Sequence, residues 1–238
     1  MNDNKDSIYR LRPACEYSFD ELKNHYLWFS RPSEFKDIND ANIVSFVLNN
    51  ESIKDSFERI FKDYNNVAKL ASYTGICCFT ETLPTTSKWK NFPGAKDGIA
   101  IEYDRNIIEQ FFINEFNIGD CFKKIEYLKE PVIFDSYSKY DIVWETTKDG
   151  AFYESLRAIE KDPKKMDKLF LMMFTRLNQN YKKQNESRII LGGANIPDKR
   201  EGIRGYKITI PKEAIKKVHF HPKTPENIIN DLKDFIGE

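Results

Sequence analysis

The stretch GIAIEYD, residues 98–104, carries the clearest β-strand pattern of the chain. Its apolar side chains at Ile99, Ile101 and Tyr103 alternate with the other positions, which places them on one face of a strand. The following stretch, RNIIEQFFINEF at residues 105–116, has the apolar spacing of a helix. The chain therefore passes directly from a strand into a helix, and both element types contribute to the predicted core.

The rest of the chain mixes strands and helices without a regular strand–helix–strand repeat. Further strands are predicted at residues 8–12, 26–30, 73–81, 121–127, 186–193, in RGYKITI (204–210) and in KKVHFH (216–221). Further helices are predicted at 40–70, at 139–182, after Thr224 and Pro225, and after the capping-box pair Ser18 and Glu21. This order predicts an α+β fold: a mixed, mostly antiparallel sheet with flanking helices. We expect a single domain over residues 1–238, in which 130–182 is a mainly helical insertion.

Composition excludes several classes of protein. The 37 basic and 37 acidic residues balance, whereas a general nucleic-acid binder shows a basic excess. The four cysteines form no CxxC pair, so neither a zinc site nor a disulfide framework is predicted. The first residues, MNDNKDSIYR, contain no apolar signal segment, and the longest apolar run, LFLMMF at 169–174, is too short to cross a bilayer. We expect a cytoplasmic protein that does not associate with membranes.

The strand at 26–30 ends abruptly at a polar residue. In LWFSRPSEFKDIND, residues 27–40, the apolar run stops at Ser30 and continues as a loop that contains Pro32 and several acids and amides. One interpretation is an ordinary connection in which Asn39 or Asp40 caps the next helix. The other is that the strand delivers Ser30 to the floor of a binding site, with Trp28 beside it.

The loop at residues 82–97 is long for a compact domain, and such loops are often binding loops or lids. Trp89 and Phe92 stand in it beside Lys88 and Lys90. Both aromatic rings could anchor the loop to the core. Alternatively, they form a stacking surface for a flat ring, with the lysines close to a phosphate.

Two strands near the C-terminal half carry polar side chains at strand spacing. Gln184, Glu186 and Arg188 fall on one face, either as a site or as a solvated sheet edge. His219 and His221 also share a face and could hold a metal ion together, but such pairs arise by chance on half-exposed strands. We therefore predict no metal site.

Several stretches together resemble a bacterial family known only as domain-of-unknown-function family 2971. They are IYRLR, LWFSRPSEFKDINDAN, CCFTE followed by KWKNFPGAKDGIAIEYD, YKKQNESRIIL and KITIPKEAIKKVHFHPKTPE. The chain departs from that family where it has Asp37-Ile38-Asn39-Asp40 in place of Asp-Pro-Phe, Asn91 in place of a histidine, and Gln184 in place of a glutamate. The family implies no established activity.

The same motifs resemble, more loosely, ADP-ribosyltransferases of the arginine–serine–glutamate type. The matching residues, in chain order, are Arg10 or Arg12, Ser30 after Trp28, and Gln184-x-Glu186. The resemblance implies a split sheet and NAD as substrate. It further implies an arginine on the NAD phosphate, a serine near the nicotinamide ribose, and Glu186 as the carboxylate that stabilises the oxocarbenium-like state, with Gln184 near the acceptor. Trp89 or Phe92 would stack on nicotinamide or adenine.

The expected function is therefore that of an NAD-dependent ADP-ribosyltransferase-like enzyme, such as a toxin or phage-defence effector, with a protein or nucleic-acid acceptor. Two alternatives remain open. One is a non-catalytic module that senses a nucleotide or binds a partner protein. The other is a metal-dependent phosphodiesterase or nuclease, in which magnesium would be held by acids from the set Asp37, Asp40, Glu81, Glu102 and Glu186.

Overall fold

The computed structural model describes residues 6–35, 40, 74–83, 85, 89, 98–129, 174–192, 195–196 and 203–236. Eight strands form one sheet: β1 (Ser7–Arg12), β2 (Tyr26–Ser30), β3 (Thr74–Thr80), β4 (Ile99–Asp104), β5 (Lys123–Lys124), β8 (Glu186–Gly192), β9 (Gly205–Thr209) and β10 (Ile215–Phe220). Every pairing within this sheet is antiparallel. A second, two-stranded parallel sheet joins β6 (Glu126–Leu128) to β7 (Arg176–Asn178). The predicted α+β fold with a mostly antiparallel sheet is confirmed.

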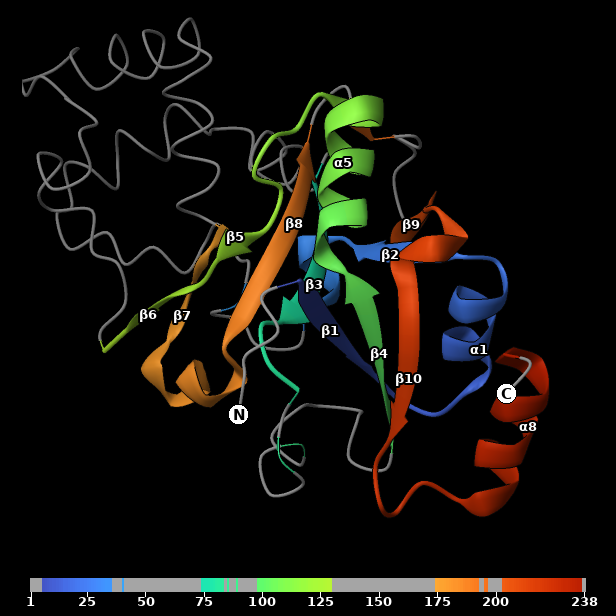
Figure 1. Ribbon diagram of the computed structural model, residues 1–238. Coiled ribbons are helices and arrows are strands. Elements are labelled where there is room, and N and C mark those ends of the chain that lie inside the picture. Colours follow the sequence, from blue (N-terminus) through green and yellow to red (C-terminus); the bar gives the residue numbers. More distant parts are fainter. Residues whose placement is uncertain are drawn as a thin grey trace, which may run out of the picture.

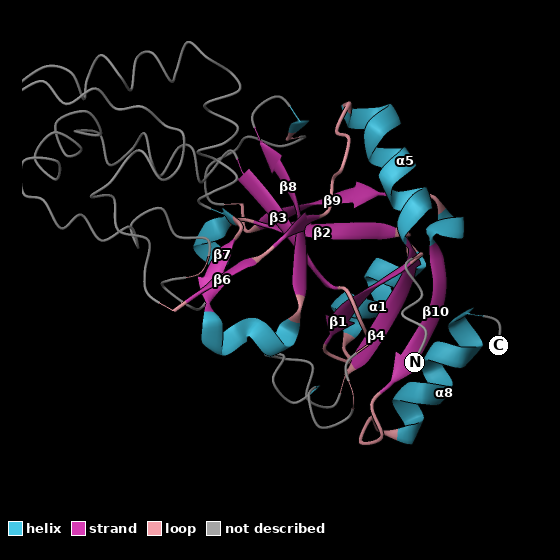
Figure 2. Cartoon of the chain, turned by 60° about the vertical axis from the view of Figure 1, so that its left-hand side comes forward, coloured by secondary structure: helices cyan, strands magenta, loops and turns pink. Residues whose placement is uncertain are grey.

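The large sheet forks at β3. Strand β8 pairs with β3 along its whole length, from Thr74 to Thr80. The other edge of β3 is shared, because β1 joins it at Thr80 and β2 joins it at Ile76. One branch continues as β1, β4 and β10, and the other as β2 and β9. Figure 2 shows β2 and β9 running across the direction of β4 and β10.

The helices pack on one face of the sheet, which we call the core face. Strand β4 leads directly into α5 (Arg105–Phe116), and α8 (Glu226–Ile236) lies beside β10 (Figure 1). Helix α5 begins at Asp104, whose Oδ1 accepts a hydrogen bond from the Ile107 amide at 3.1 Å. One buried cluster joins the strands to α1 (Glu16–Lys23), α5 and α8 through Ile8, Leu22, Phe29, Ile101, Ile108, Phe112, Ile189 and Leu232.

A buried arginine bridges the two branches where the sheet forks. Arg10 of β1 donates from Nη2 to the Trp28 carbonyl of β2 at 2.9 Å, and its Nη1 contacts Cys77 of β3. Burial raises the pKa of Cys77 to about 12, so Arg10 faces a neutral thiol. Its charge is balanced by Glu21 of α1, whose Oε1 lies 3.2 Å from Arg10 Nε and whose Oε2 lies 3.0 Å from Arg12 Nε.

These ion pairs explain why the predicted capping box is wrong. Helix α1 begins at Glu16, with Cys15 in the cap position and no capping side chain. Glu21 is fully buried, and its carboxylate forms ion pairs with two arginines of the neighbouring strand. A carboxylate engaged in this way is not available to the first turn of the helix.

Most of the predicted helix at 139–182 lies outside the described residues, but its C-terminal end does not. From Arg176 the chain forms β7 and then a 3₁₀-helix, η4 (Gln179–Gln184). The strand predicted at 121–127 is broken into β5 and β6. The helices predicted at 40–70 lie, apart from Asp40, outside the described part of the chain. Short 3₁₀-helices η1 (Pro32–Glu34) and η6 (Lys212–Ala214) complete the elements. Among the described residues no helix is long and apolar enough to cross a membrane.

Candidate functional site

A row of polar residues crosses the sheet on the face opposite the core face. It runs from Glu186 through Thr80, Tyr9 and Glu102 to Lys217, on β8, β3, β1, β4 and β10 respectively, each directly opposite the next. Residues that lie directly opposite each other across antiparallel strands share one face of the sheet. We call this row the polar row and its side of the sheet the site face. Of the predicted catalytic and cofactor-binding residues, the polar row contains Glu186.

Glu186 is fixed at one end of the polar row. Its Oε1 accepts a hydrogen bond from Arg188 Nε at 2.6 Å. Its main chain is anchored as well, since the amide donates to Tyr127 Oη at 2.7 Å and the carbonyl accepts from the Ile125 amide at 3.1 Å. Glu186 therefore does not lie on a solvated sheet edge. Within the described chain Oε2 makes no hydrogen bond, and the side chain is 10% exposed.

Arg188, which holds Glu186, is itself held by three further groups. Its Nη2 donates to Asp40 Oδ1 at 2.7 Å, and its Nη1 donates to the Phe174 carbonyl at 3.0 Å. The guanidinium also lies 5.4 Å from the centre of the Phe35 ring. The strand spacing in the sequence predicted that Arg188 shares a face with Glu186, but it gave Arg188 no role. The two-residue separation of Glu186 and Arg188 was the signal that could have identified the pair. The structure shows a fully buried arginine that orients the carboxylate.

Ser30 and Trp28 lie on the site face but not beside Glu186. Ser30 pairs with Ile76 on β3, whereas Glu186 pairs with Thr80, four residues further along. Strand geometry puts the Cα atoms of Ser30 and Glu186 about 16 Å apart. Within the described chain the Ser30 hydroxyl makes no hydrogen bond, and the Trp28 indole packs against Gly205, where an added Cβ would lie 2.7 Å from it.

The remaining predicted site residues are separated from Glu186 or turned inward. Arg10 and Arg12 lie on the core face, since Tyr9 between them is on the site face, and both are paired with Glu21. Gln184 is buried at the end of η4, and its carbonyl accepts a hydrogen bond from Thr80 Oγ1 at 2.6 Å. The structure thus does not bring Arg10 or Arg12 together with Glu186.

Trp89 acts as an anchor for its loop. It is buried against Ala100 and Leu11 on the site face, and its ring lies 5.4 Å from that of His221 in an edge-on arrangement. Its Nε1 is buried without a hydrogen-bond partner in the described chain. A ring covered in this way does not offer a stacking face. Phe92, Lys88 and Lys90 lie outside the described residues.

A hydrogen-bonded network surrounds Glu102 in the polar row. His219 Nε2 lies 2.7 Å from Glu102 Oε2, and Ser7 Oγ donates to Glu102 Oε1 at 2.7 Å. Lys216 Nζ in turn donates to Ser7 Oγ at 3.1 Å. Burial alone would raise the pKa of Glu102, but the hydrogen bonds from Ser7 and His219 outweigh it and hold the pKa below its ordinary value. The sequence pattern indicated Glu102 only as a candidate magnesium ligand and gave no sign of this network.

Replacing Glu102 by glutamine should remove a pH-dependent part of the stability. Because the folded-state pKa is lowered, the carboxylate stabilises the native state above its ordinary pKa of 4.5, and this stabilisation is lost as the pH falls through the lower folded-state value. We expect Glu102→Gln to be less stable than wild type at neutral pH, by an amount that shrinks on acidification. Urea unfolding over a pH series measures this difference. A difference independent of pH would contradict it.

His221 makes contacts separate from those of His219. Its Nδ1 accepts a hydrogen bond from the Lys223 amide at 3.1 Å, and its ring packs on Trp89. The acids of the predicted magnesium alternative are likewise distributed over separate partners: Glu81 is paired with Arg105 at 2.5 Å and Asp40 with Arg188 at 2.7 Å. Across the described ranges no group of three or more potential metal ligands occurs. Asp37 lies outside them.

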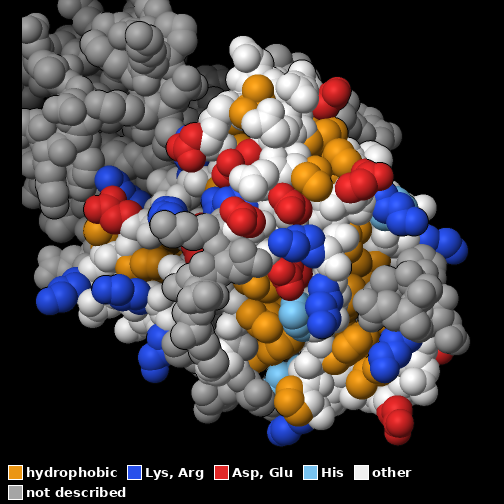
Figure 3. Space-filling view, viewed as in Figure 1, with side chains coloured by type: hydrophobic (Ala, Val, Ile, Leu, Met, Phe, Trp, Pro, Cys, Tyr) orange, Lys and Arg blue, Asp and Glu red, His pale blue; other side chains and the backbone are white. Residues whose placement is uncertain are grey.

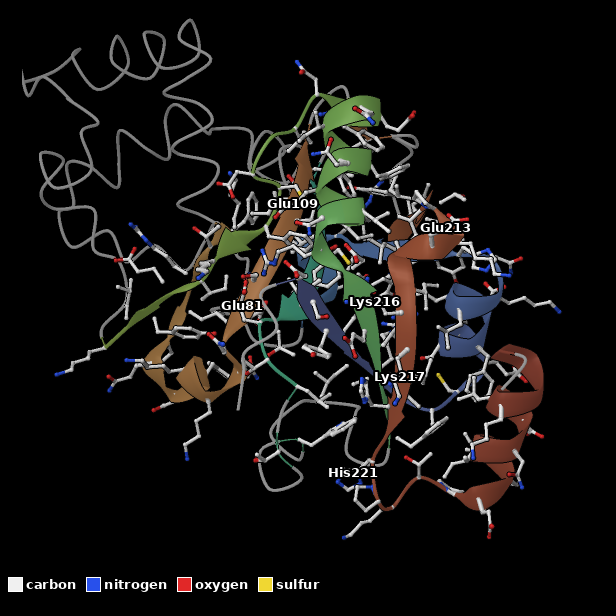
Figure 4. All side chains as sticks on the ribbon, in the orientation of Figure 1. Glu81, Glu109, Glu213, Lys216, Lys217 and His221 are labelled. Carbon is white, nitrogen blue, oxygen red and sulfur yellow. The ribbon has the colours of Figure 1, made fainter. Side chains whose placement is uncertain are left out.

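Figure 3 shows the chemistry of this side of the molecule. Acidic, basic and histidine side chains lie next to one another over β4 and β10, beside a strip of hydrophobic groups. Figure 4 labels Lys216 and Lys217 along β10, and His221 beyond the end of that strand. The site face therefore offers both charged and apolar contacts.

Comparison of the chain with protein-family models, with curated proteins and with solved structures finds no match.

Proposed function

We propose that the protein is an NAD-dependent ADP-ribosyltransferase-like enzyme that binds its dinucleotide along the polar row. The observation that carries this proposal is Glu186. A buried arginine fixes one of its carboxylate oxygens, and the other makes no hydrogen bond within the described chain. A carboxylate with one oriented, unengaged oxygen suits the recognition of a ribose hydroxyl and the stabilisation of a developing cation.

In the proposed reaction the bond between ribose C1′ and the nicotinamide nitrogen breaks, and its electron pair leaves with neutral nicotinamide. The ribose then has oxocarbenium character, which the negative charge of Glu186 stabilises. An acceptor nucleophile, from a protein or a nucleic acid, forms the new bond to C1′ and releases its proton to solvent. Glu186 acts on the sugar and is unchanged at the end of the cycle.

The proposal uses fewer residues than the arginine–serine–glutamate resemblance implies. Arg10 and Arg12 both form ion pairs with Glu21, so we assign them to the stability of the sheet. Ser30 is too distant from Glu186 to contact the same ribose, and the Gln184 side chain is buried. The forked sheet and the position of Glu186 at the start of β8 are the features that support the proposal.

A non-catalytic nucleotide-binding module is the second candidate. It is favoured by the low exposure of the Glu186 side chain, 10%, which leaves little room for an acceptor to approach. Both candidates place a nucleotide on the site face, and they differ only in whether nicotinamide is released.

Ligand binding tests the proposal. We expect NAD and ADP-ribose to raise the melting temperature of the wild-type protein, and magnesium alone to leave it unchanged. A ligand at 100 times its Kd stabilises the native state by about 2.7 kcal/mol. Nicotinamide release, with and without cell lysate as acceptor, then separates enzyme from module. Absence of any shift with all nucleotides would contradict both candidates.

A further inference from the structure

The Glu102–His219 pair fixes how His219 can interact with a ligand. Glu102 is held as a carboxylate, so it only accepts hydrogen bonds, and His219 Nε2 lies 2.7 Å from its Oε2. The proton of neutral His219 therefore belongs on Nε2, which leaves Nδ1 as an acceptor. Within the described chain Nδ1 has no hydrogen-bond partner. A ligand that meets neutral His219 at this nitrogen must donate a hydrogen.

An aromatic ring lies beside that acceptor. The centres of the Tyr9 and His219 rings are 6.0 Å apart, and the rings are inclined at 61°. The His219 side chain is 23% exposed, and Tyr9 is partly exposed. The combination of a ring and an adjacent hydrogen-bond acceptor is typical of sites for flat heterocycles that carry an amino group.

The distance from this pair to Glu186 suits the two ends of one dinucleotide. Tyr9 is directly opposite Thr80, and Thr80 is directly opposite Glu186. Two strand spacings put the Cα atoms of Tyr9 and Glu186 about 10 Å apart. A dinucleotide with its nicotinamide ribose at Glu186 reaches Tyr9 and His219 with its second base, along the same face of the sheet.

We propose that Tyr9 and His219 form the adenine subsite of the dinucleotide site. The 6-amino group of adenine donates to His219 Nδ1, and the adenine ring packs against Tyr9. Glu102 is a positioning residue that keeps the proton on Nε2, and Ser7 with Lys216 holds Glu102 in place. This inference rests on the proposed function, since it requires a dinucleotide whose other end lies at Glu186.

The probe that tests the subsite is nicotinamide 1,N⁶-ethenoadenine dinucleotide, whose base has no N–H donor. Calorimetric titration should show that wild-type protein binds NAD on the order of 10-fold more tightly than the etheno analogue, because the analogue leaves Nδ1 facing an acceptor. In His219→Phe, which keeps a ring beside Tyr9 but removes Nδ1, we expect the two affinities to be equal.

The matched control for His219→Phe replaces a histidine outside the proposed subsite. His25 lies in the turn between α1 and β2 with φ of 46°, a conformation that asparagine tolerates, so His25→Asn should keep the preference for NAD. Equal binding of both ligands by wild type, or a preference that persists in His219→Phe, would overturn the adenine subsite and leave the proposed function standing. Binding of neither ligand by wild type would overturn the proposed function itself.

Discussion

Replacing Glu186 by glutamine is expected to lower the rate of NAD cleavage on the order of 100- to 1,000-fold, the usual effect of losing one well-placed electrostatic stabiliser. The amide keeps the shape of the side chain, and its oxygen can still accept from Arg188 Nε. What is lost is the negative charge opposite the developing ribose cation. Nicotinamide release by wild type and by Glu186→Gln, at saturating NAD, measures the effect.

The same substitution also tests how much Glu186 contributes to the free energy of unfolding. Had it lain on a solvated edge, its replacement would cost less than about 0.5 kcal/mol. Because it is paired with a buried arginine, we expect a loss of about 1–3 kcal/mol in the free energy of unfolding. Glu126→Gln is the matched control, since Glu126 also pairs with an arginine but is 59% exposed. Equal turnover by wild type and Glu186→Gln would contradict the catalytic role.

Replacing Arg188 by methionine should be the most destabilising single change in the site. Methionine fills a similar volume but leaves Glu186 and Asp40 without the cation that both contact, and leaves the Phe174 carbonyl without its donor. Removing one partner of a buried ion pair costs about 3–5 kcal/mol. Urea unfolding monitored by fluorescence gives the difference in free energy.

One further variant separates charge from geometry at position 188, and a second, at an exposed arginine, serves as the control. Arg188→Lys keeps the charge but cannot donate to three groups in fixed directions, so its stability should lie between those of wild type and Arg188→Met. Arg204→Met removes an arginine that is 83% exposed and paired with Glu34, so its loss of stability should be far smaller than that of Arg188→Met. A loss at Arg188→Met no larger than at Arg204→Met would contradict a central role for Arg188.

Local patterns in the sequence were enough to predict most strands. The alternation in GIAIEYD and the apolar spacing after it match β4 and α5, because these elements depend on residues close together in the chain. The C-terminal helix after Pro225 is found for the same reason. The prediction of a helix up to residue 182 is wrong at Arg176–Asn178, because pairing of β7 with β6 overrides the local preference for helix.

The site was harder to predict, because its contacts join distant parts of the sequence. Glu186 was identified from its spacing to Gln184, yet the residue that orients it, Arg188, is linked to Asp40, which lies 148 positions away. The bond between Glu102 and His219 spans 117 positions. Without the register of β1, β4 and β10, nothing in the sequence places these side chains together. The fork at β3 could not be predicted for the same reason, because it depends on which residues of β1 and β2 pair with β3.

The structural role of Arg10 could not be predicted from the sequence. An arginine on an N-terminal strand suits a phosphate, and the sequence offers no sign that Glu21 of the next helix will pair with both Arg10 and Arg12. The buried pair stabilises the fork in the sheet, so its effect on NAD binding is expected to be indirect.

The central claim, that one dinucleotide lies along the polar row with its ribose at Glu186, is tested most directly by a crystal structure of the protein with a non-hydrolysable NAD analogue. The predicted result is a nicotinamide ribose hydroxyl within hydrogen-bond distance of Glu186 Oε2, with adenine against Tyr9 and His219. An analogue bound elsewhere, with Glu186 and His219 both free of contact, would contradict the account.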